Sequence, residues 1–190
     1  PNPTSKYVKI VRSGPHFPDQ NEVIELATGK SEILPLRSSQ VPSPRKARRE
    51  WYTSRDGTRV PITWLTTPDT LDPAPVLITV YGAYGVPQNQ GYQPQLGPLL
   101  KQGLAIVQIH VRGGGELGPT WHEAGRHHQK VNSINDFIDG VDYLLGSGRI
   151  DPEQVFVRGV SAGAVIVAAA VNKRPELFAG VVLRAAYLDL

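Results

Sequence analysis

Ser161 lies in a sequence pattern that can make a serine nucleophilic. A short apolar run at 154–158 is typical of a strand, the pentapeptide Gly-Val-Ser-Ala-Gly follows at 159–163, and an alanine-rich helical run follows at 162–173. A serine on a sharp strand-to-helix turn has a strained backbone that pushes its Oγ clear of the sheet. The helix that begins beside it places N–H donors and a positive dipole end where an oxyanion would form. The pattern predicts a nucleophile, and a plain tight turn is the alternative.

The two glycines of this pentapeptide have a predicted steric role. Side chains at Gly159 and Gly163 would collide across the turn, so we expect both positions to lack room for a Cβ.

A second candidate is the loop Tyr-Gly-Ala-Tyr-Gly at 81–85, which follows an apolar strand. In enzymes built on such a turn, a loop after an earlier strand supplies the second oxyanion donor. A tyrosine hydroxyl can donate to the developing negative charge, and the glycines allow a close backbone approach. We favour Tyr84, which lies in the turn, over Tyr81, which ends the strand. An aromatic loop that only packs on its own domain is the alternative.

A general base for Ser161 is not evident. No histidine follows Ser161 in the sequence, and a serine hydroxyl needs a positioned base near neutral pH. The cluster His122, His127 and His128 precedes it, whereas the acid and then the histidine normally follow this kind of serine. Asp189 is rejected as the acid because that residue usually lies one strand–helix unit later. The three histidines also lack metal-ligand spacing, so we predict exposed loop histidines, no metal and no cofactor.

Two further motifs are interpreted as structural. The glycine run at 113–118 matches a dinucleotide fingerprint, but no helix opens inside it, as a pyrophosphate site requires. We expect a turn bordering the active-site face, with Arg112 paired to a carboxylate. The basic residues at 45–49 lie in a proline-bounded stretch and are expected to be solvated rather than to bind nucleic acid.

The periodicity predicts two regions. Strands are expected at 7–12, 22–26 and 31–34, with a Thr-Gly-Lys turn in the last pair, and a linker is expected over 35–50. So few strands cannot bury a core alone and must pack against another part of the protein. The later part alternates strands and helices, which indicates an α/β sheet. Its expected elements are a hairpin at 50–65, strands at 76–81, 104–111, 154–158 and 179–185, and helices at 132–145 and 162–173.

Composition excludes several classes of protein. The 190 residues contain 40% hydrophobic and 19% charged residues, with a net charge of +3, which does not indicate nucleic-acid binding. Cysteine is absent, so disulfides and thiolate chemistry are excluded, in keeping with the cytoplasmic location that we expect. No apolar run approaches the length of about 18 residues that a membrane span needs. The chain begins with proline and contains no methionine, so we expect an internal segment of a longer protein.

Five motifs in one order resemble the prolyl oligopeptidase family of serine peptidases, nearest its oligopeptidase B and prolyl-endopeptidase-like branches. They are YTSRDGTRVP at 52–61, VYGAYG at 80–85, HVRGGGELG at 110–118, GVSAG at 159–163 and NKRPELF at 172–178. The resemblance implies a partial α/β-hydrolase fold, lacking its C-terminal part, over 45–190. Residues 1–44 then correspond to the last strands of a β-propeller and a linker.

The resemblance also implies a function. Ser161 would be the nucleophile in the cleavage of short peptides through an acyl-enzyme, and the backbone N–H of Ala162 would form the oxyanion hole with a tyrosine, for which we favour Tyr84. The triad aspartate and histidine would lie beyond Leu190, so we expect residues 1–190 alone to be inactive. An esterase or thioesterase, or a non-catalytic interaction protein on the same fold, remains an alternative. Short peptides are the expected partners, with no nucleic acid or membrane, and neither the oligomeric state nor the residue preferred at the cleaved bond is specified.

Overall fold

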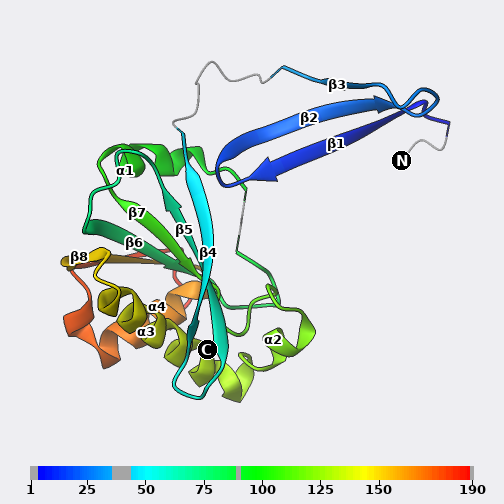
Figure 1. Cartoon of the computed structure of the whole chain (residues 1–190). Helices are drawn as coiled ribbons and strands as arrows, with labels where there is room; N and C mark the ends of the chain where they lie inside the picture. Colours follow the sequence, from blue (N-terminus) through cyan, green and yellow to red (C-terminus); the bar gives the residue numbers. More distant parts are fainter. Residues whose placement is uncertain (1–3, 36–43, 89–90, 189–190) are drawn as a thin grey trace.

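The computed structural model describes residues 4–35, 44–88 and 91–188, and within them the strands form two separate sheets. The first is antiparallel, in the order β1-β2-β3. Its strands are β1 (Tyr7–Gly14), β2 (Phe17–Glu25) and β3 (Ser31–Ile33). Figure 1 shows this sheet projecting from one end of the larger α/β body.

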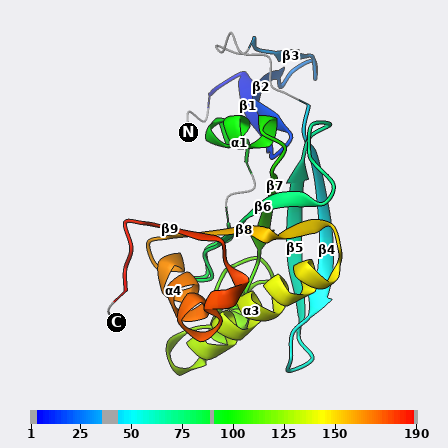
Figure 2. The same cartoon turned by 90° about the vertical axis from the view of Figure 1, so that its left-hand side faces the viewer.

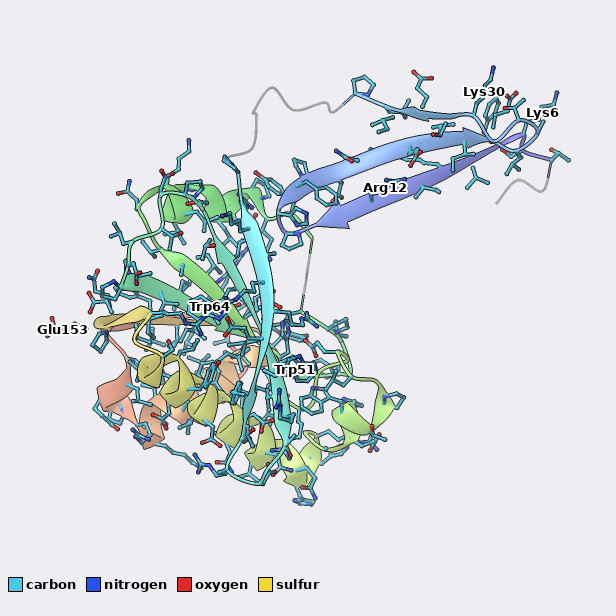
Figure 3. All side chains as sticks on the ribbon, in the orientation of Figure 1. Lys6, Arg12, Lys30, Trp51, Trp64 and Glu153 are labelled. Carbon is cyan, nitrogen blue, oxygen red and sulfur yellow. The ribbon has the colours of Figure 1, made fainter. Side chains whose placement is uncertain are left out.

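The three-stranded sheet has no core of its own, as its sequence predicts. The side chains of β1 are exposed from Tyr7 to Ser13, and the ion pair Arg12–Glu22, 2.7 Å long, crosses to β2. The predicted turn between β2 and β3 is confirmed, because the Gly29 N–H donates to Glu25 O at 2.8 Å. Figure 3 shows Lys6, Arg12 and Lys30 on this sheet, away from the body that holds Trp64.

The second sheet has six strands in the order β4-β5-β7-β6-β8-β9. The pairs β4–β5 and β5–β7 are antiparallel, and the other three pairs are parallel. Its strands are β4 (Lys46–Thr53), β5 (Arg59–Thr66), β6 (Ala74–Val80), β7 (Ala105–Ile109), β8 (Ile150–Val160) and β9 (Gly180–Arg184). Strands β6, β7 and β8 run parallel to one another, so the loops that follow them meet at the same edge of the sheet.

Helices cover both faces of this sheet. The helices are α1 (Gly97–Lys101), α2 (Pro119–Glu123), α3 (Lys130–Gly146) and α4 (Gly163–Lys173). Figure 2 shows α3 and α4 together on one face, where Phe137 and Ile166 pack with Val76, Val107 and other strand residues. The opposite face is covered by α1, whose Leu100 packs with Leu77 and Ile106. Coverage of both faces explains why the central strands β6 and β7 are almost entirely apolar.

The predicted linker over 35–50 is wrong at its C-terminal end, because β4 begins at Lys46. Residues 36–43 lie outside the described residues. β4 is an edge strand, and its exposed basic side chains give it the composition of a solvated segment. Arg45 also departs from the expected solvated state, since it is buried with its guanidinium 4.0 Å from the centroid of the Tyr92 ring. The domain boundary between residues 44 and 45 stays a prediction.

Candidate functional site

Ser161 occupies a strained turn between β8 and α4, as the sequence predicts. Its φ is +51°, in the left-handed region that non-glycine residues rarely adopt. The Ser161 N–H donates to Arg184 O of β9 at 3.0 Å, which anchors the turn to the neighbouring strand. The main chain therefore holds Ser161 at the end of β8, where the parallel strands present their following loops.

The two glycines beside Ser161 are required by packing, which confirms the steric expectation. A Cβ added at Gly159 would lie 2.7 Å from Ala164 Cα, and one added at Gly163 would lie 2.5 Å from Val80 O. Real Cβ atoms essentially never come this close to backbone atoms. The start of α4 can approach the end of β6 because no side chain separates them.

The N-terminus of α4 provides backbone donors beside the serine. Ala162 is the N-cap residue of α4, and helix N-termini carry partial positive charge. Within the three described ranges, no oxygen accepts a hydrogen bond from the Ala162 N–H. This N–H is thus available to an oxyanion formed on the serine side of the turn.

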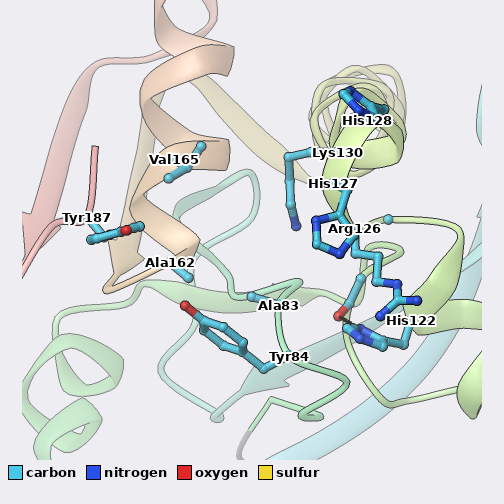
Figure 4. Close-up of a pocket in the computed structure, with 12 residues that line it drawn as sticks. Ala83, Tyr84, His122, Arg126, His127, His128, Lys130, Ala162, Val165 and Tyr187 are labelled. Carbon is cyan, nitrogen blue, oxygen red and sulfur yellow. Dashed lines mark hydrogen bonds between the residues drawn. The ribbon is translucent and has the colours of Figure 1, made fainter. Parts of the chain in front are cut away.

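The 81–85 loop places Tyr84 close to Ala162. Tyr84 has φ +58° and is 69% exposed, so its side chain stands out from the loop. Figure 4 shows its hydroxyl directed toward Ala162 across the cavity. Tyr81 lines a different, smaller cavity with Arg158 and Val160. The turn geometry expected for Tyr84 is confirmed, while its chemical role stays a prediction.

A cavity of about 850 Å³ lies between this loop, the N-terminal ends of α3 and α4, and the segment after β9. Ser161 is not among its lining residues, although Ala162 is. The three histidines of the sequence cluster also line it, and no described hydrogen bond joins any of them to Ser161. The cavity is lined by Ala83, Tyr84, Gly113, His122, Gly125, Arg126, His127, His128, Lys130, Ala162, Val165 and Tyr187.

The histidines do not form a metal site in the part of the chain that the structure describes. His127 and His128 are exposed, as expected. His122 departs from that expectation because it is half-buried in α2 and its Nδ1 lies 3.0 Å from Gly113 O. A carbonyl oxygen only accepts, so Nδ1 donates this bond. Its role here is to hold the 113–118 loop.

Three polar side chains on one face of α3 hold the loops that surround the cavity, and sequence analysis did not single them out. Lys130 Nζ donates to Gly82 O at 2.6 Å, and Ser133 Oγ donates to Arg112 O at 2.6 Å. Asp136 accepts from the Arg112 N–H at 3.1 Å. The spacing of three residues places all three on one side of the helix. Their polar character within a helix that is otherwise apolar on its buried side was the available signal.

Arg112 has the carboxylate partners that the sequence predicts. Its Nη2 lies 2.6 Å from Asp136 Oδ1, and its Nη1 lies 2.6 Å from Asp56 Oδ2. Partial burial acts to raise the pKa of Asp56, but hydrogen bonds from Arg112 and Thr58 outweigh it and lower this pKa to about 2. The Arg112 guanidinium is almost fully buried between its two partners. The glycine run therefore begins at a rigid, charge-paired position and acts as a structural turn.

A second buried network lies under the same loop. His110 Nδ1 lies 3.2 Å from Glu116 Oε1, and the same oxygen accepts from the Gln88 N–H at 3.0 Å. Burial acts to raise the pKa of Glu116, and the hydrogen bonds from His110 and Gln88 lower it below its ordinary value. His110 Nε2 lies 2.8 Å from Thr63 Oγ1 of β5. This network ties the loop after β7 to the sheet rather than to the cavity.

Asp189, which we reject as the triad acid, lies outside the described residues. No helix in the described ranges is both long and apolar enough to cross a membrane.

The sequence model of the prolyl oligopeptidase family matches residues 92–190. "Protease 2" of Moraxella lacunata is 33% identical over 172 residues, which cover 88% of this chain and 25% of that protein. The "Prolyl endopeptidase-like" protein of Xenopus laevis is 40% identical over 139 residues, which cover 72% of this chain and 20% of that protein. The solved structure of oligopeptidase B from Trypanosoma brucei with covalently bound antipain is 30% identical in sequence, with a TM-score of 0.86. The match covers 94% of this chain and 26% of that one.

These similarities confirm the expected fold class, which is part of an α/β hydrolase preceded by short strands like those at the end of a β-propeller. The chain spans between a fifth and a quarter of the length of the two curated relatives.

Proposed function

We propose that this chain, which belongs to the prolyl oligopeptidase family, carries the nucleophile of a serine-type peptidase. Ser161 Oγ would attack the carbonyl carbon of a peptide bond, and its proton would pass to a histidine outside residues 1–190. The amine would leave, and water would release the acyl group from Ser161. The strained φ of +51° at Ser161, at the start of α4, is the observation that carries this proposal.

The oxyanion hole is proposed to combine one backbone and one side-chain donor. The Ala162 N–H lies at the N-terminus of α4, and the Tyr84 hydroxyl is directed toward Ala162. Donors aimed in advance at the developing oxyanion contribute strongly because they do not reorganise during the reaction. We call residues 81–85 the oxyanion loop on the basis of this proposal.

Short peptides are the proposed substrates, and a cytoplasmic location is proposed from the absence of cysteine. The relatives named above carry peptidase names, and one of them was solved with covalently bound antipain. We also propose that residues 1–44 belong to a separate β-propeller domain. The three-stranded sheet supports this division because it does not pair with the six-stranded sheet in the described ranges.

The proposed function is tested by labelling the full-length protein with a fluorophosphonate and mapping the modified residue by mass spectrometry. We expect a single modified peptide that contains Ser161. Parallel assays with short peptides, aryl esters and thioesters separate the substrate classes. Turnover of esters or thioesters with no peptide cleavage would contradict the peptidase assignment, and a folded protein with no label and no turnover would favour a non-catalytic role.

Replacing Tyr84 by phenylalanine should lower kcat by about 10²–10³-fold and leave KM nearly unchanged. The hydroxyl would be lost while the exposed aromatic ring remains. The measurement is steady-state kinetics on a short peptide substrate.

Tyr81→Phe is the matched control for Tyr84→Phe. A Cβ added at Gly163 would lie 3.1 Å from Tyr81 Cα, so the backbone of Tyr81 also lies beside the turn that holds Ser161. A full kcat in Tyr84→Phe, together with a loss in Tyr81→Phe, would transfer the donor role to Tyr81.

A further inference from the structure

We propose that Lys130 is a positioning residue, whose ammonium sets the oxyanion loop by holding the carbonyl of Gly82. This inference rests on the proposed function, because it concerns how the oxyanion donors of that site are aligned. Lys130 Nζ lies 2.6 Å from Gly82 O, and the two residues are 48 positions apart in the chain. The contact joins the first turn of α3 to the loop after β6.

The backbone conformation of Gly82 sets the direction of the oxyanion loop. Gly82 lies between Tyr81 and Tyr84, and its φ of +58° is in the left-handed region. A Cβ at this position would lie 2.4 Å from Val111 Cγ2 and 2.9 Å from Ile166 Cδ1. A rotation of the Gly82 peptide would change the backbone direction on both sides of it and so move Tyr81 and Tyr84. The orientation of the Gly82 carbonyl therefore matters whichever tyrosine hydroxyl donates to the oxyanion.

The far side of the loop is held by backbone contacts. The Gly85 N–H donates to Gly113 O at 3.1 Å. A Cβ added at Gly113 would lie 2.4 Å from Gly82 O, so the Gly82 carbonyl packs directly against the 113–118 loop. Lys130 reaches this carbonyl from the cavity, which it also lines. The loop is therefore fixed by the 113–118 loop and by one lysine from α3.

The partial burial of Lys130 indicates a structural role for its ammonium. Lys130 is half-buried, and this burial lowers the pKa of its ammonium because water is removed from the charged form. An ammonium withdrawn from water needs compensation, and the Gly82 carbonyl provides a short, charge-assisted hydrogen bond. The neighbouring turns of the same helix face hold Arg112 through Ser133 and Asp136 in the same manner.

The test is Lys130→Met in the full-length protein, with methionine replacing the aliphatic stem but not the donor. A misplacement of about 1 Å at a reacting group can cost on the order of 10²-fold in rate. We therefore expect kcat to fall by about 10–10²-fold with KM changed by less than about 2-fold. Lys130→Arg retains a cationic donor and should recover part of this loss.

Two controls separate positioning from general damage. Lys173→Met makes the same substitution at an exposed position in the last turn of α4 and should leave kcat unchanged. Lys130→Met combined with Tyr84→Phe, or with Tyr81→Phe if that is the donor, completes a double-mutant cycle. If Lys130 acts through that tyrosine, the double variant should lose much less than the product of the two single losses.

The outcomes distinguish this inference from the proposed function. Ser161→Ala with full turnover would remove the proposed function itself. An inactive Ser161→Ala protein with a folded, fully active Lys130→Met protein would overturn the role of Lys130 alone. Equal losses in kcat and in apparent substrate affinity for Lys130→Met would do the same. So would strictly multiplicative effects of the two substitutions in the double-mutant cycle. If Lys130→Met does not fold, Lys130→Gln, which keeps a neutral donor, is measured against Lys130→Arg, and equal kcat values at the wild-type level would also overturn it.

Discussion

Ser161→Ala in the full-length protein should lower kcat by on the order of 10⁶-fold and abolish labelling by a fluorophosphonate. The loss is large because the remaining donors can stabilise an oxyanion but cannot form the acyl-enzyme. The strained backbone should persist, since it is held by the Ser161 N–H bond to Arg184 O and by the packing of Gly159 and Gly163. Turnover and labelling are measured on the same preparation, with circular dichroism to establish that the variant is folded.

Ser147→Ala is the matched control for this experiment. Ser147 caps the end of α3, where its Oγ donates to Leu144 O at 2.6 Å, away from the site. Its replacement should leave labelling and kcat intact. Labelling that survived in Ser161→Ala and disappeared in another serine variant would show that a different residue is the nucleophile.

Arg112→Met should destabilise the α/β body by about 3–5 kcal/mol, because it leaves the buried carboxylate of Asp136 without its partner. The Asp136 side chain is fully buried and accepts from both the Arg112 guanidinium and the Arg112 N–H. For a domain of this size, such a loss corresponds to a fall of on the order of 10 °C in the unfolding midpoint. Differential scanning calorimetry of the full-length protein measures it.

Arg174→Met is the control for the stability prediction. Arg174 pairs with Asp142 at 3.3 Å and also contacts Glu176, but its side chain and both partners are largely exposed. Solvent screens an exposed ion pair, which therefore contributes little to stability, so this variant should unfold close to the wild type. Equal midpoints for Arg112→Met and Arg174→Met would contradict the structural role of Arg112.

The same network predicts a pH dependence. The pKa of Asp56 is about 2 in the folded protein, below its ordinary value of 3.8, so its contribution to stability is present above pH 3.8 and is lost as the pH falls through 2. Asp56 is partly exposed, which keeps this contribution small. In Arg112→Met the difference in unfolding midpoint between pH 5 and pH 2 should shrink, and an unchanged difference would assign the dependence to other carboxylates.

The part of the site that sequence alone could predict is the part determined by short-range geometry. A glycine two residues on either side of Ser161, between an apolar strand and an alanine-rich helix, permits one tight turn and little else. The pairing of Arg112 with a carboxylate could also be predicted, because an arginine next to a buried strand needs a partner. Which carboxylates would serve could not be read from the sequence, since Asp56 and Asp136 are 56 and 24 positions away.

The polar face of α3 shows why the remainder required the folded structure. Lys130 is an ordinary lysine in the sequence, and its importance comes from the packing of α3 against β4, β5 and β8, which brings Nζ to Gly82 O. The sequence predicts a linker up to residue 50, which includes the first part of edge strand β4, because exposed charged residues are typical of both a linker and an edge strand. Whether Tyr84 or Tyr81 donates is likewise a question of which cavity each side chain enters.

By itself, the sequence determined the α/β alternation, the sharp turn at Ser161, the glycines that allow it and the family to which the chain belongs. Each of these depends on residues close together in the chain, where backbone sterics and periodicity leave few alternatives. Only the tertiary structure decided which side chains meet: Arg112 with Asp56 and Asp136, and Lys130 with Gly82. Those contacts depend on sheet order and helix packing, and small differences summed over the whole core select one arrangement among many of similar local quality.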